Sequence, residues 1–420
     1  MPSLGLQAVG RQIFKDGAPF RHIGCNHFSL FMREFINFGV PNTGLANDVT
    51  AMAAAGIKVI RVAFGFYDYA GWRDYYYNAQ PAYWAKVDQV MDAIAGAGLM
   101  VIANMGWSPR AFSQLTYLST GATLAPRLMS DKTSPAYTLM EGYLTAFVQR
   151  YRNHPAVAAW EFGNENSVSL GNEFRAEWPL DGTGTDGGGT ALPYGTPGGG
   201  GTNWGTKPEG GNYAAADKMS NADYQRWCGY LREICYRNDP WGRMVLSGDA
   251  MGNAFAVTTR RANSLANDSR ADWNGRPDTG GMSWLAYREA EFTAICNHIY
   301  PLATDTSKTA FFSDGVRTYG QHIADSKGWA DAVDKPLVLE EFGATQYGSP
   351  VDPVSTGSAV LEAANFNAAL SGIVASDVPL ALVWNWGGAL GPVEWQKWDI
   401  THASRAYQLQ AIQAVNASRT

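Results

Sequence analysis

The sequence contains few residues of the kinds that build metal or redox centres. It has only four cysteines and six histidines among 420 residues, and no two cysteines form a CxxC pair. Cys25 and Cys296 lie inside apolar stretches that read as strands. We therefore expect Cys25, Cys228, Cys235 and Cys296 to be reduced, buried and structural, and we expect neither a metal nor a cofactor.

Charged residues are also scarce, at 17% of the chain, and the net charge is -6. No cluster of Lys and Arg alternates with aromatic residues, which argues against a nucleic-acid partner. No apolar run approaches the roughly 20 residues that cross a bilayer, and the first residues lack the basic and apolar regions of a signal peptide. We expect no membrane partner, while the compartment stays open: secreted or periplasmic if a leader has been removed, and cytoplasmic otherwise.

Aromatic residues, in contrast, are plentiful, with 15 Trp and 20 Tyr. Flat rings with a polar edge stack on sugar faces, and they also fill protein cores. The hydrophobic fraction of 46% is ample for a large core. Composition therefore allows either a sugar-binding cleft or a large aromatic core.

Short apolar stretches alternate with longer amphipathic ones along the whole chain, an order typical of parallel strands joined by helices. Eight stretches are predicted to be strands: 21–28, 57–64, 99–105, 157–164, 243–249, 293–300, 336–343 and 379–386. Helical patterns follow them: 45–55, 83–98, 135–152, 220–238, 282–291, 315–328, 357–376 and 404–417. This arrangement predicts an α/β protein, a (β/α)8 TIM barrel with enlarged loops, as one domain over residues 1–420. A doubly wound open sheet agrees less well with the sequence, because no glycine-rich phosphate-binding turn follows the first predicted strand.

Two segments stand outside this repeat. RQIFKDGAPFRHI, residues 11–23, contains an Asp16-Gly17 turn between apolar stretches and predicts a short hairpin that caps the floor of the barrel. A glycine-rich segment at about 168–215 predicts a long loop after the fourth strand, because glycine raises the entropy cost of order. We expect this loop to border the cleft.

Two carboxylates lie where predicted strands end. Glu165 follows the fourth strand in VAAWEFGNE, and Glu341 lies near the end of the seventh in LVLEEFGA. The strands of such a barrel end at one mouth, where reacting groups are found. A retaining glycosidase uses two carboxyl groups about 5 Å apart, one to protonate the leaving oxygen and one to attack the anomeric carbon.

Four motifs in chain order carry a resemblance to a known family. YRNHPAVAAWEFGNE, NHIYP, LVLEEFGA and LVWNW resemble the strand-four, strand-six, strand-seven and strand-eight signatures of glycoside hydrolase family 5, whose members are (β/α)8 retaining glycosidases. The likeness is closest to the endo-β-1,4-mannanases and the cellulase-like members. Mannanases of this branch commonly continue NEPR where this chain has NENS, a difference that concerns the substrate and leaves the catalytic carboxylates in place.

The resemblance implies a catalytic role for each residue that matches a family motif. It makes Glu165 the acid/base and Glu341 the nucleophile. His298 and Tyr300 match the HxY pair of strand six, in which the tyrosine holds the nucleophile ionised and oriented. Arg61 would lie beneath the nucleophile and lower its pKa through its charge. An alternative for His298 is an ordinary core histidine.

The resemblance also implies contacts to the sugar. Asn164 matches the position that hydrogen-bonds the sugar 2-hydroxyl, and Trp384 matches the tryptophan beneath the reacting sugar. Asn26 and Trp107 are expected to add sugar contacts by their places at the ends of the first and third strands. For both tryptophans the alternative is packing in the core.

Other interpretations of the carboxylates stay open at this point. Glu165 could form a structural ion pair with Arg61. Strand alternation sends Glu340 and Glu341 to opposite faces, so only one of them can be the nucleophile, and Glu341 is preferred because it adjoins the exit from the strand. Glu161 is expected to be a structural partner one layer deeper.

The sequence therefore predicts a retaining glycoside hydrolase that cleaves β-linked polysaccharide or oligosaccharide, with β-1,4-mannan or glucomannan as the preferred substrate and a monomer as the expected state. A β-1,4-glucanase and an exo-acting β-mannosidase or β-glucosidase are alternatives within the same family. A transglycosylase would use identical residues. A non-catalytic sugar-binding barrel is the alternative from another class.

Overall fold

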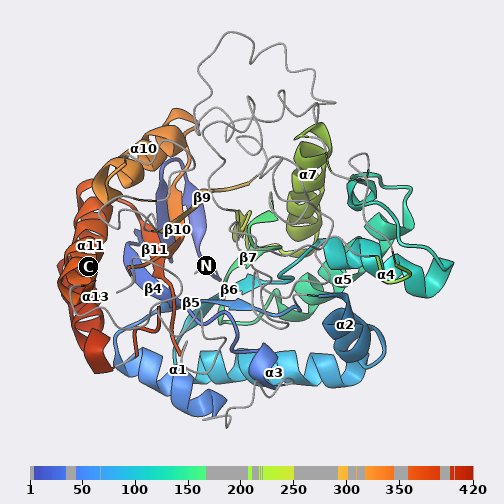
Figure 1. Cartoon of the computed structure of the whole chain (residues 1–420), viewed down its shortest axis with the longest axis horizontal. Helices are drawn as coiled ribbons and strands as arrows, with labels where there is room; N and C mark the ends of the chain where they lie inside the picture. The colour runs from blue at the N-terminus through green and yellow to red at the C-terminus, as the bar shows by residue number, and fades with distance from the viewer. Residues whose placement is uncertain are drawn as a thin grey trace.

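Eight parallel strands form the central sheet of the computed structural model, in the spatial order β8, β7, β6, β5, β4, β11, β10 and β9 (Figure 1). The strands are His22–Asn26 (β4), Val59–Ala63 (β5), Met100–Asn104 (β6), Val157–Glu161 (β7), Met244–Leu246 (β8), Ile295–Ile299 (β9), Leu337–Phe342 (β10) and Leu380–Val383 (β11). All eight lie within the predicted stretches, so the (β/α)8 barrel is confirmed. The structure describes residues 4–34, 44–66, 68–166, 207–210, 217, 219, 221–249, 292–300, 309, 317–344, 358–387, 398–401 and 403–419.

The two ends of the sheet, β8 and β9, meet through one threonine. The Thr293 backbone N–H donates to the Val245 carbonyl at 3.1 Å, and the Val245 N–H donates to the Thr293 hydroxyl oxygen at 2.8 Å. A side-chain oxygen therefore replaces one carbonyl of the ladder. These bonds bring the last open edge together, which is the closure that a barrel needs.

Helices surround the sheet (Figure 1). Those of the described residues are Leu45–Ala54 (α1), Tyr69–Gly71 (α2), Gln80–Gly96 (α3), Arg110–Thr120 (α4), Pro135–Tyr151 (α5), Asn221–Asn238 (α7), Tyr319–Ala332 (α10), Ser358–Ala375 (α11) and Ala406–Ser418 (α13). In α3 the buried residues recur at helical spacing, namely Tyr83, Val87, Val90, Met91 and Ile94. The predicted helix at 282–291 lies outside the described residues, as does most of the glycine-rich segment. None of the described helices is both long and apolar enough to cross a membrane.

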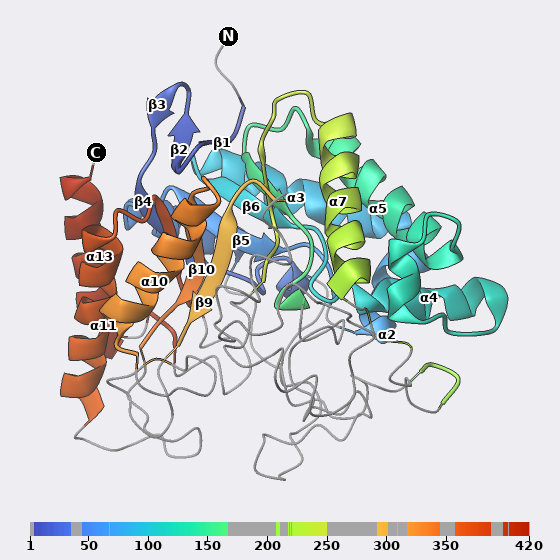
Figure 2. The ribbon, with the colours of Figure 1, turned by 90° about the horizontal axis from the view of Figure 1, so that it is seen from above.

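A small antiparallel sheet of Gln7–Val9 (β1), Gln12–Lys15 (β2) and Ala18–Pro19 (β3) lies at one end of the barrel (Figure 2). Asp16 and Gly17 form its turn with positive φ values of 54° and 80°, as an Asp-Gly turn between strands favours. Leu6 donates to the carbonyl of Ala158 and accepts from Met244, at the starts of β7 and β8. The predicted cap on the barrel floor is confirmed.

Two hydrophobic cores follow from the alternation of the strands. The larger lies between the sheet and the helices. The smaller fills the barrel interior near its floor, and its members are Leu6, Ile13, Val59, Ile102, Ala158, Ala159, Met244, Leu246, Ala294, Cys296, Val338, Leu380 and Leu382. All four cysteines are buried and none forms a disulfide, as the sequence predicts.

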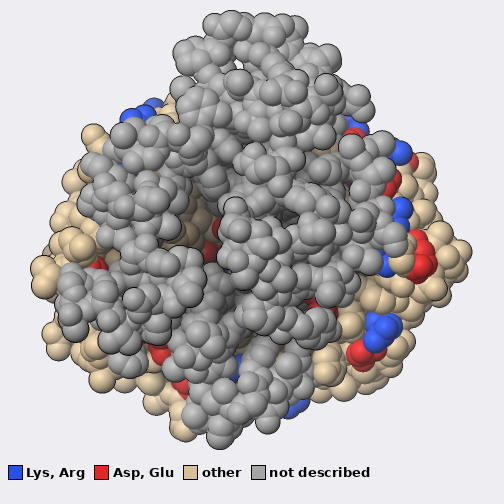
Figure 3. Space-filling view, in the orientation of Figure 1, with Lys and Arg blue, Asp and Glu red and all other residues tan. Residues whose placement is uncertain are grey.

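Charges on the described surface are mixed in sign. On the face in Figure 3, Lys and Arg side chains lie among Asp and Glu side chains along the right-hand edge of the described part. Ion pairs between described residues include Arg150 with Asp88 and Arg237 with Glu141.

Candidate active site

The chain leaves β7 through a tight turn that presents Asn164 and Glu165 at the mouth. Gly163 has a φ of 99°, and a Cβ built on it would lie 1.6 Å from the Asn166 side-chain oxygen. Glu165 itself adopts a φ of 47°, in the left-handed region that residues with a Cβ seldom occupy. This turn therefore requires a glycine at position 163 and holds Glu165 in an uncommon conformation.

Neighbouring strands hold this turn in place. The Asn164 N–H donates to the Trp107 carbonyl at 2.9 Å, and the Glu165 N–H donates to the Gly248 carbonyl at 2.7 Å. The Asn166 amide donates to Ser247 of the next strand at 2.7 Å. These bonds on both sides stabilise the left-handed conformation and fix the direction of the Glu165 side chain.

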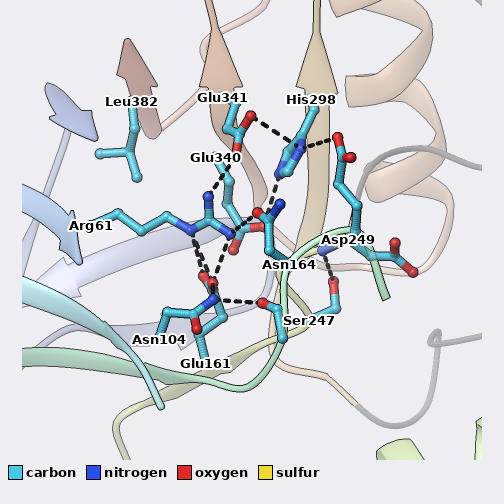
Figure 4. Close-up of polar contacts among 12 residues, drawn as sticks. Arg61, Asn104, Glu161, Asn164, Ser247, Asp249, His298, Glu340, Glu341 and Leu382 are labelled. Carbon is cyan, nitrogen blue, oxygen red and sulfur yellow. Dashed lines mark hydrogen bonds and ion pairs between the residues drawn. The ribbon is translucent and has the colours of Figure 1, made fainter. Parts of the chain in front are cut away.

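Arg61, in the middle of β5, is fully buried and connects the polar groups of the barrel (Figure 4). Its Nε donates to Glu161 at 2.9 Å, Nη1 donates to Glu341 at 2.8 Å, and Nη2 donates to the Asn164 side-chain oxygen at 2.8 Å. Although burial alone would lower the pKa of Arg61, the charges of Glu161, Glu340 and Glu341 raise it above its usual value. Arg61 therefore stays cationic beneath the mouth.

Glu341 is held at both carboxylate oxygens. Oε1 accepts from Arg61 at 2.8 Å, and Oε2 accepts from the Tyr300 hydroxyl. Burial and the Glu341 charge raise the pKa of Tyr300 well above its usual value, so the phenol keeps its proton and donates. This arrangement fixes the direction of one carboxylate, at the residue to which the resemblance gives the role of nucleophile.

A β-bulge in β10 corrects the expectation about Glu340 and Glu341. Leu339 pairs with Asn297, whereas Glu341 pairs with His298, so one extra residue of β10 stands opposite β9. Strict alternation would send Glu341 outward, but the bulge turns it inward as well. Both carboxylates face His298, at 3.8 Å for Glu340 and 3.5 Å for Glu341. The prediction that the two face opposite sides is wrong.

Glu165 pairs with His298, and not with Arg61 as the alternative interpretation of the sequence has it. The His298 Nδ1 lies 3.0 Å from Glu165 Oε1, whereas the ion pairs of Arg61 are with Glu161 and Glu341. Burial alone would lower the pKa of His298, but the surrounding carboxylates of Glu341, Glu165 and Glu340 raise it to about 10. His298 is therefore a cation at neutral pH.

Glu165, His298 and Glu341 converge on one point. One potential ligand atom from each lies within 4.8 Å of the others, so the two carboxylates face each other across the mouth. These atom types also suit a metal ion, and within the described residues this is the one such group of three or more. Arg61 and Tyr300 already donate to both oxygens of Glu341, so a metal would have to compete with them.

Asn164 has its amide orientation fixed by Arg61. Because a guanidinium only donates hydrogen bonds, the Asn164 atom at 2.8 Å from Nη2 is the oxygen. The amino group of the amide then points to the other side. The predicted contact from Asn164 to the sugar 2-hydroxyl is compatible with this orientation and stays a prediction.

Aromatic rings line the site beside Arg61. Phe28 lies under the Arg61 guanidinium at 4.7 Å and contacts both Trp107, edge to face at 5.0 Å, and Trp384 at 5.8 Å. Each tryptophan keeps 8% of its surface exposed. The predicted sugar contacts of Trp107 and Trp384 stay predictions, while their packing against Phe28 is observed.

Asn26 differs from the expected sugar contact. Its amide nitrogen donates to the Glu340 carbonyl at 2.7 Å, and its oxygen accepts from Arg61 at 3.3 Å. The side chain is fully buried. This geometry favours a role in holding Arg61 over a contact to the sugar.

The motifs do not reveal the polar layer below the carboxylates. Glu161 was expected to be structural, and it is bound by Arg61 and by Asn104. Asn104 also donates to the Gly163 carbonyl at 2.6 Å, so it connects Glu161 with the turn that carries Glu165. Polar residues inside the inward-facing positions of strands were the available signal for this layer.

Residues 15–185 match the family model described as cellulase, glycosyl hydrolase family 5. The matched range contains Arg61, Glu161, Asn164 and Glu165, and it ends before His298. The match confirms the resemblance that the motifs suggest. No curated protein shows significant sequence similarity to the chain.

Solved structures share the fold at low sequence identity. The endo-1,4-β-mannanase of Rhizomucor miehei has a TM-score of 0.60 and 14% identity, covering 99% of this chain and 100% of that one. The endo-β-1,4-mannanase of Thermotoga petrophila also has a TM-score of 0.60 and 14% identity, over 96% and 79%. A family 5 mannosidase of Rhizomucor miehei has a TM-score of 0.57 and 14% identity, over 98% and 97%. At this identity the likeness concerns the fold.

Proposed function

We propose that this chain, a glycoside hydrolase by its match to family 5, cleaves β-1,4-linked mannan or glucomannan with retention of the anomeric configuration. The observation that carries the proposal is the approach of Glu165 to Glu341, with carboxylate oxygens within 4.8 Å of each other. A separation of about 5 Å suits direct attack by a carboxylate, whereas inverting enzymes leave room of about 6.5 to 9.5 Å for a water molecule.

In the first step Glu165 acts as the acid. It gives its proton to the glycosidic oxygen while the bond from that oxygen to the anomeric carbon breaks. Glu341 forms a bond to the same carbon through a carboxylate oxygen, giving a glycosyl ester. Arg61 and Tyr300, which donate to Glu341, hold this carboxylate in the direction of attack.

In the second step Glu165 acts as the base. As a carboxylate it takes a proton from a water molecule, whose oxygen bonds to the anomeric carbon and displaces Glu341. The products are two shortened sugars and a restored Glu165 acid, at the expense of one water. Two inversions at one carbon leave the configuration unchanged.

The amide of Asn164 strengthens the transition state in this proposal. Arg61 fixes its oxygen at 2.8 Å, so its amino group is available to the sugar 2-hydroxyl. A hydrogen bond to that hydroxyl tightens as the ring flattens toward the oxocarbenium-like state. Trp384 and Trp107 would stack on sugar faces beside it.

Mannan is preferred over glucan on two grounds. The WExxNE, HxYP and EEFG motifs are closest to the mannanase branch, and similar folds include two endo-mannanases and a mannosidase. The replacement of NEPR by NENS keeps β-1,4-glucan and exo attack as competing possibilities. We further propose that the chain acts as a monomeric, single-domain enzyme.

A substrate screen tests the proposal. The purified enzyme is incubated with mannan, glucomannan, carboxymethylcellulose, xylan and aryl β-glycosides, and release of reducing sugars is measured. The highest activity is expected on mannan or glucomannan, and the size of the first products separates endo from exo attack. Tight binding of oligosaccharide without any release would instead support a non-catalytic barrel.

Two variants separate the roles of the carboxylates. Glu165→Ala should lose activity on mannan but keep reaction with an aryl glycoside whose leaving group needs no proton. Glu341→Ala should lose activity on every substrate. Equal losses in both variants on both substrates would contradict the acid role of Glu165.

A further inference from the structure

A second carboxylate pair lies directly below the first. Glu161 and Glu340 are both fully buried in the barrel interior, and their carboxyl groups interact with each other. Two ionised carboxylates buried near each other disfavour each other's charged form. We therefore expect one of the two to keep a proton.

The buried charges lead to the same conclusion. Arg61 and His298 supply two positive charges among Glu161, Glu340 and Glu341. One proton on the lower pair balances the three carboxyls against the two cations, which a buried site needs. Burial and the Glu340 charge raise the pKa of Glu161 to about 8, against the opposing charge of Arg61.

Glu340 is the member of the pair that faces His298. The bulge in β10 brings its Oε2 to 3.8 Å from His298 Nε2. Within the described residues, neither oxygen of Glu340 has a hydrogen-bond partner, and His298 Nε2 has none. Burial alone would raise the pKa of Glu340, but His298 and Arg61 lower it. Glu340 is thus an anion whose main counter-charge on this side is His298.

His298 in turn contacts the acid/base. Its Nδ1 lies 3.0 Å from Glu165. A neutral imidazole at this distance would be a stronger base than a carboxylate and would take the proton that Glu165 must give to the leaving oxygen. A histidine that already carries its proton cannot do so.

We propose that Glu340 is a positioning residue of the reaction, which keeps His298 protonated from below so that Glu165 retains its acid proton. Glu161, by keeping its own proton, prevents an excess of negative charge in the lower layer. The expected effect of Glu340 on the reaction rate rests on the proposed function. Its expected effect on the protonation of His298 does not, because that can be measured without substrate.

The titratable and charged groups around His298 come from each neighbouring element. Glu165 follows β7, Glu340 and Glu341 belong to β10, and Arg61 reaches the same carboxylates from β5. On its own strand, Tyr300 donates to Glu341. Of these, Glu340 is the one that contacts the Nε2 edge and takes no direct part in bond making.

The test replaces Glu340 by its uncharged isostere. In Glu340→Gln the titration of His298, followed by NMR of its ring nitrogens in the absence of substrate, should move to lower pH by about one unit or more. The alkaline limb of kcat/KM on the best substrate should move in the same direction. An unchanged His298 titration would overturn the inference.

A matched control is available in Glu362→Gln. Glu362 is equally buried but pairs with Arg405 at 3.3 Å and accepts from Tyr407, away from the barrel interior. This variant should lose stability without moving either pH profile. An equal shift in the control would mean that buried carboxylates act only through stability.

Glu161→Gln gives an independent test if Glu340→Gln does not fold. This change leaves the charge of Glu340 in place, so the His298 titration should stay in place or move to higher pH. A move to lower pH would contradict the assignment. Because NMR reads His298 directly, a failure here is distinguishable from a failure of the proposed activity, which the substrate screen measures.

Discussion

The floor and the mouth of the barrel interior are built from the same strands, two residues apart, and differ in almost every property. Near the floor, β5 contributes Val59 to the barrel interior. Two residues later it contributes Arg61 to the mouth layer. In the same way Val338 of β10 is followed by Glu340. The lower layer is apolar and closed by the β1–β3 sheet, while the upper layer holds paired charges.

The difference teaches where the sequence rules hold. In the floor layer of β5, β10 and β11, alternation decides which residues face inward, namely Val59, Val338, Leu380 and Leu382. In the mouth layer, a bulge in β10 and a left-handed residue at Glu165 override alternation. Regular strands supply stability, and the local departures bring Glu165 and Glu341 together.

Replacing Arg61 by methionine should have the largest effect. Removal of the cation leaves Glu161, Glu340 and Glu341 as buried carboxyls with one cation fewer, a change that costs about 3 to 5 kcal/mol when one partner of a buried pair is lost. Activity should fall with stability. Urea unfolding and kcat/KM on the best substrate measure both.

Arg405→Met is the comparison for that change, since Arg405 is also buried and pairs with Glu362. It should lower the free energy of unfolding while kcat/KM per folded molecule stays unchanged. If Arg61→Met retained activity, the proposed role of Arg61 under the nucleophile would be wrong.

Leu380→Ala changes the floor layer alone. Leu380 is fully buried in the lower core, and such truncations cost about 2 to 5 kcal/mol through lost contacts and the cavity left behind. We expect lower stability in urea and unchanged kcat/KM at temperatures where the variant is folded. A strong loss of kcat/KM there would show that floor and mouth are coupled.

Substitutions of two glycines with positive φ, Gly163 and Gly17, provide a further comparison with a smaller expected effect on stability. Gly163→Ala would place a Cβ on the Asn166 side chain, whereas at Gly17 no atom lies within 4 Å. Both variants should lose about 1 kcal/mol from the strained backbone, and Gly163→Ala should lose more because its Cβ collides with Asn166. Only Gly163→Ala should also reduce kcat, because the turn carries Glu165. Equal kcat values in the two variants would contradict this role of the turn.

The pH dependence of stability should reflect the mouth layer. His298 has its pKa raised from 6.5 to about 10, and Glu161 has its pKa raised from 4.5 to about 8. Both groups bind more protons in the folded state, so their stabilisation is complete at low pH and is lost as pH rises through these windows. The free energy of unfolding, measured from pH 5 to 10, should therefore decline because of these two groups.

Glu161→Gln should remove the decline below about pH 6.5 and reduce it between pH 6.5 and 8, while the His298 contribution between pH 6.5 and 10 remains. An amide does not titrate, so the carboxyl's contribution disappears. If the decline between pH 5 and 8 is the same in the variant, Glu161 does not hold the extra proton.

Much of the fold was readable from the sequence, because strand stretches and helical periods are local patterns. The eight strands and the Asp16-Gly17 turn follow from apolar runs and turn chemistry. The inward position of Glu341 was not derivable from alternation, since a bulge depends on pairing with β9. The place of Asn26 beneath Arg61 likewise depends on contacts between strands that are distant in sequence.

The site itself was predicted through strand ends and motifs. Glu165, Glu341, His298 and Tyr300 do come together. The lower pair of Glu161 and Glu340 was missed as a unit, because the protonation state of a buried carboxyl leaves no mark in a sequence.

The most direct test of the central claim is to trap the sugar on the enzyme. A brief reaction with 2-deoxy-2-fluoro-β-mannosyl fluoride, whose good leaving group needs little acid help, should leave a covalent sugar that mass spectrometry of the digested protein locates on Glu341. A sugar on Glu340, or no adduct together with a product of inverted configuration, would contradict the account.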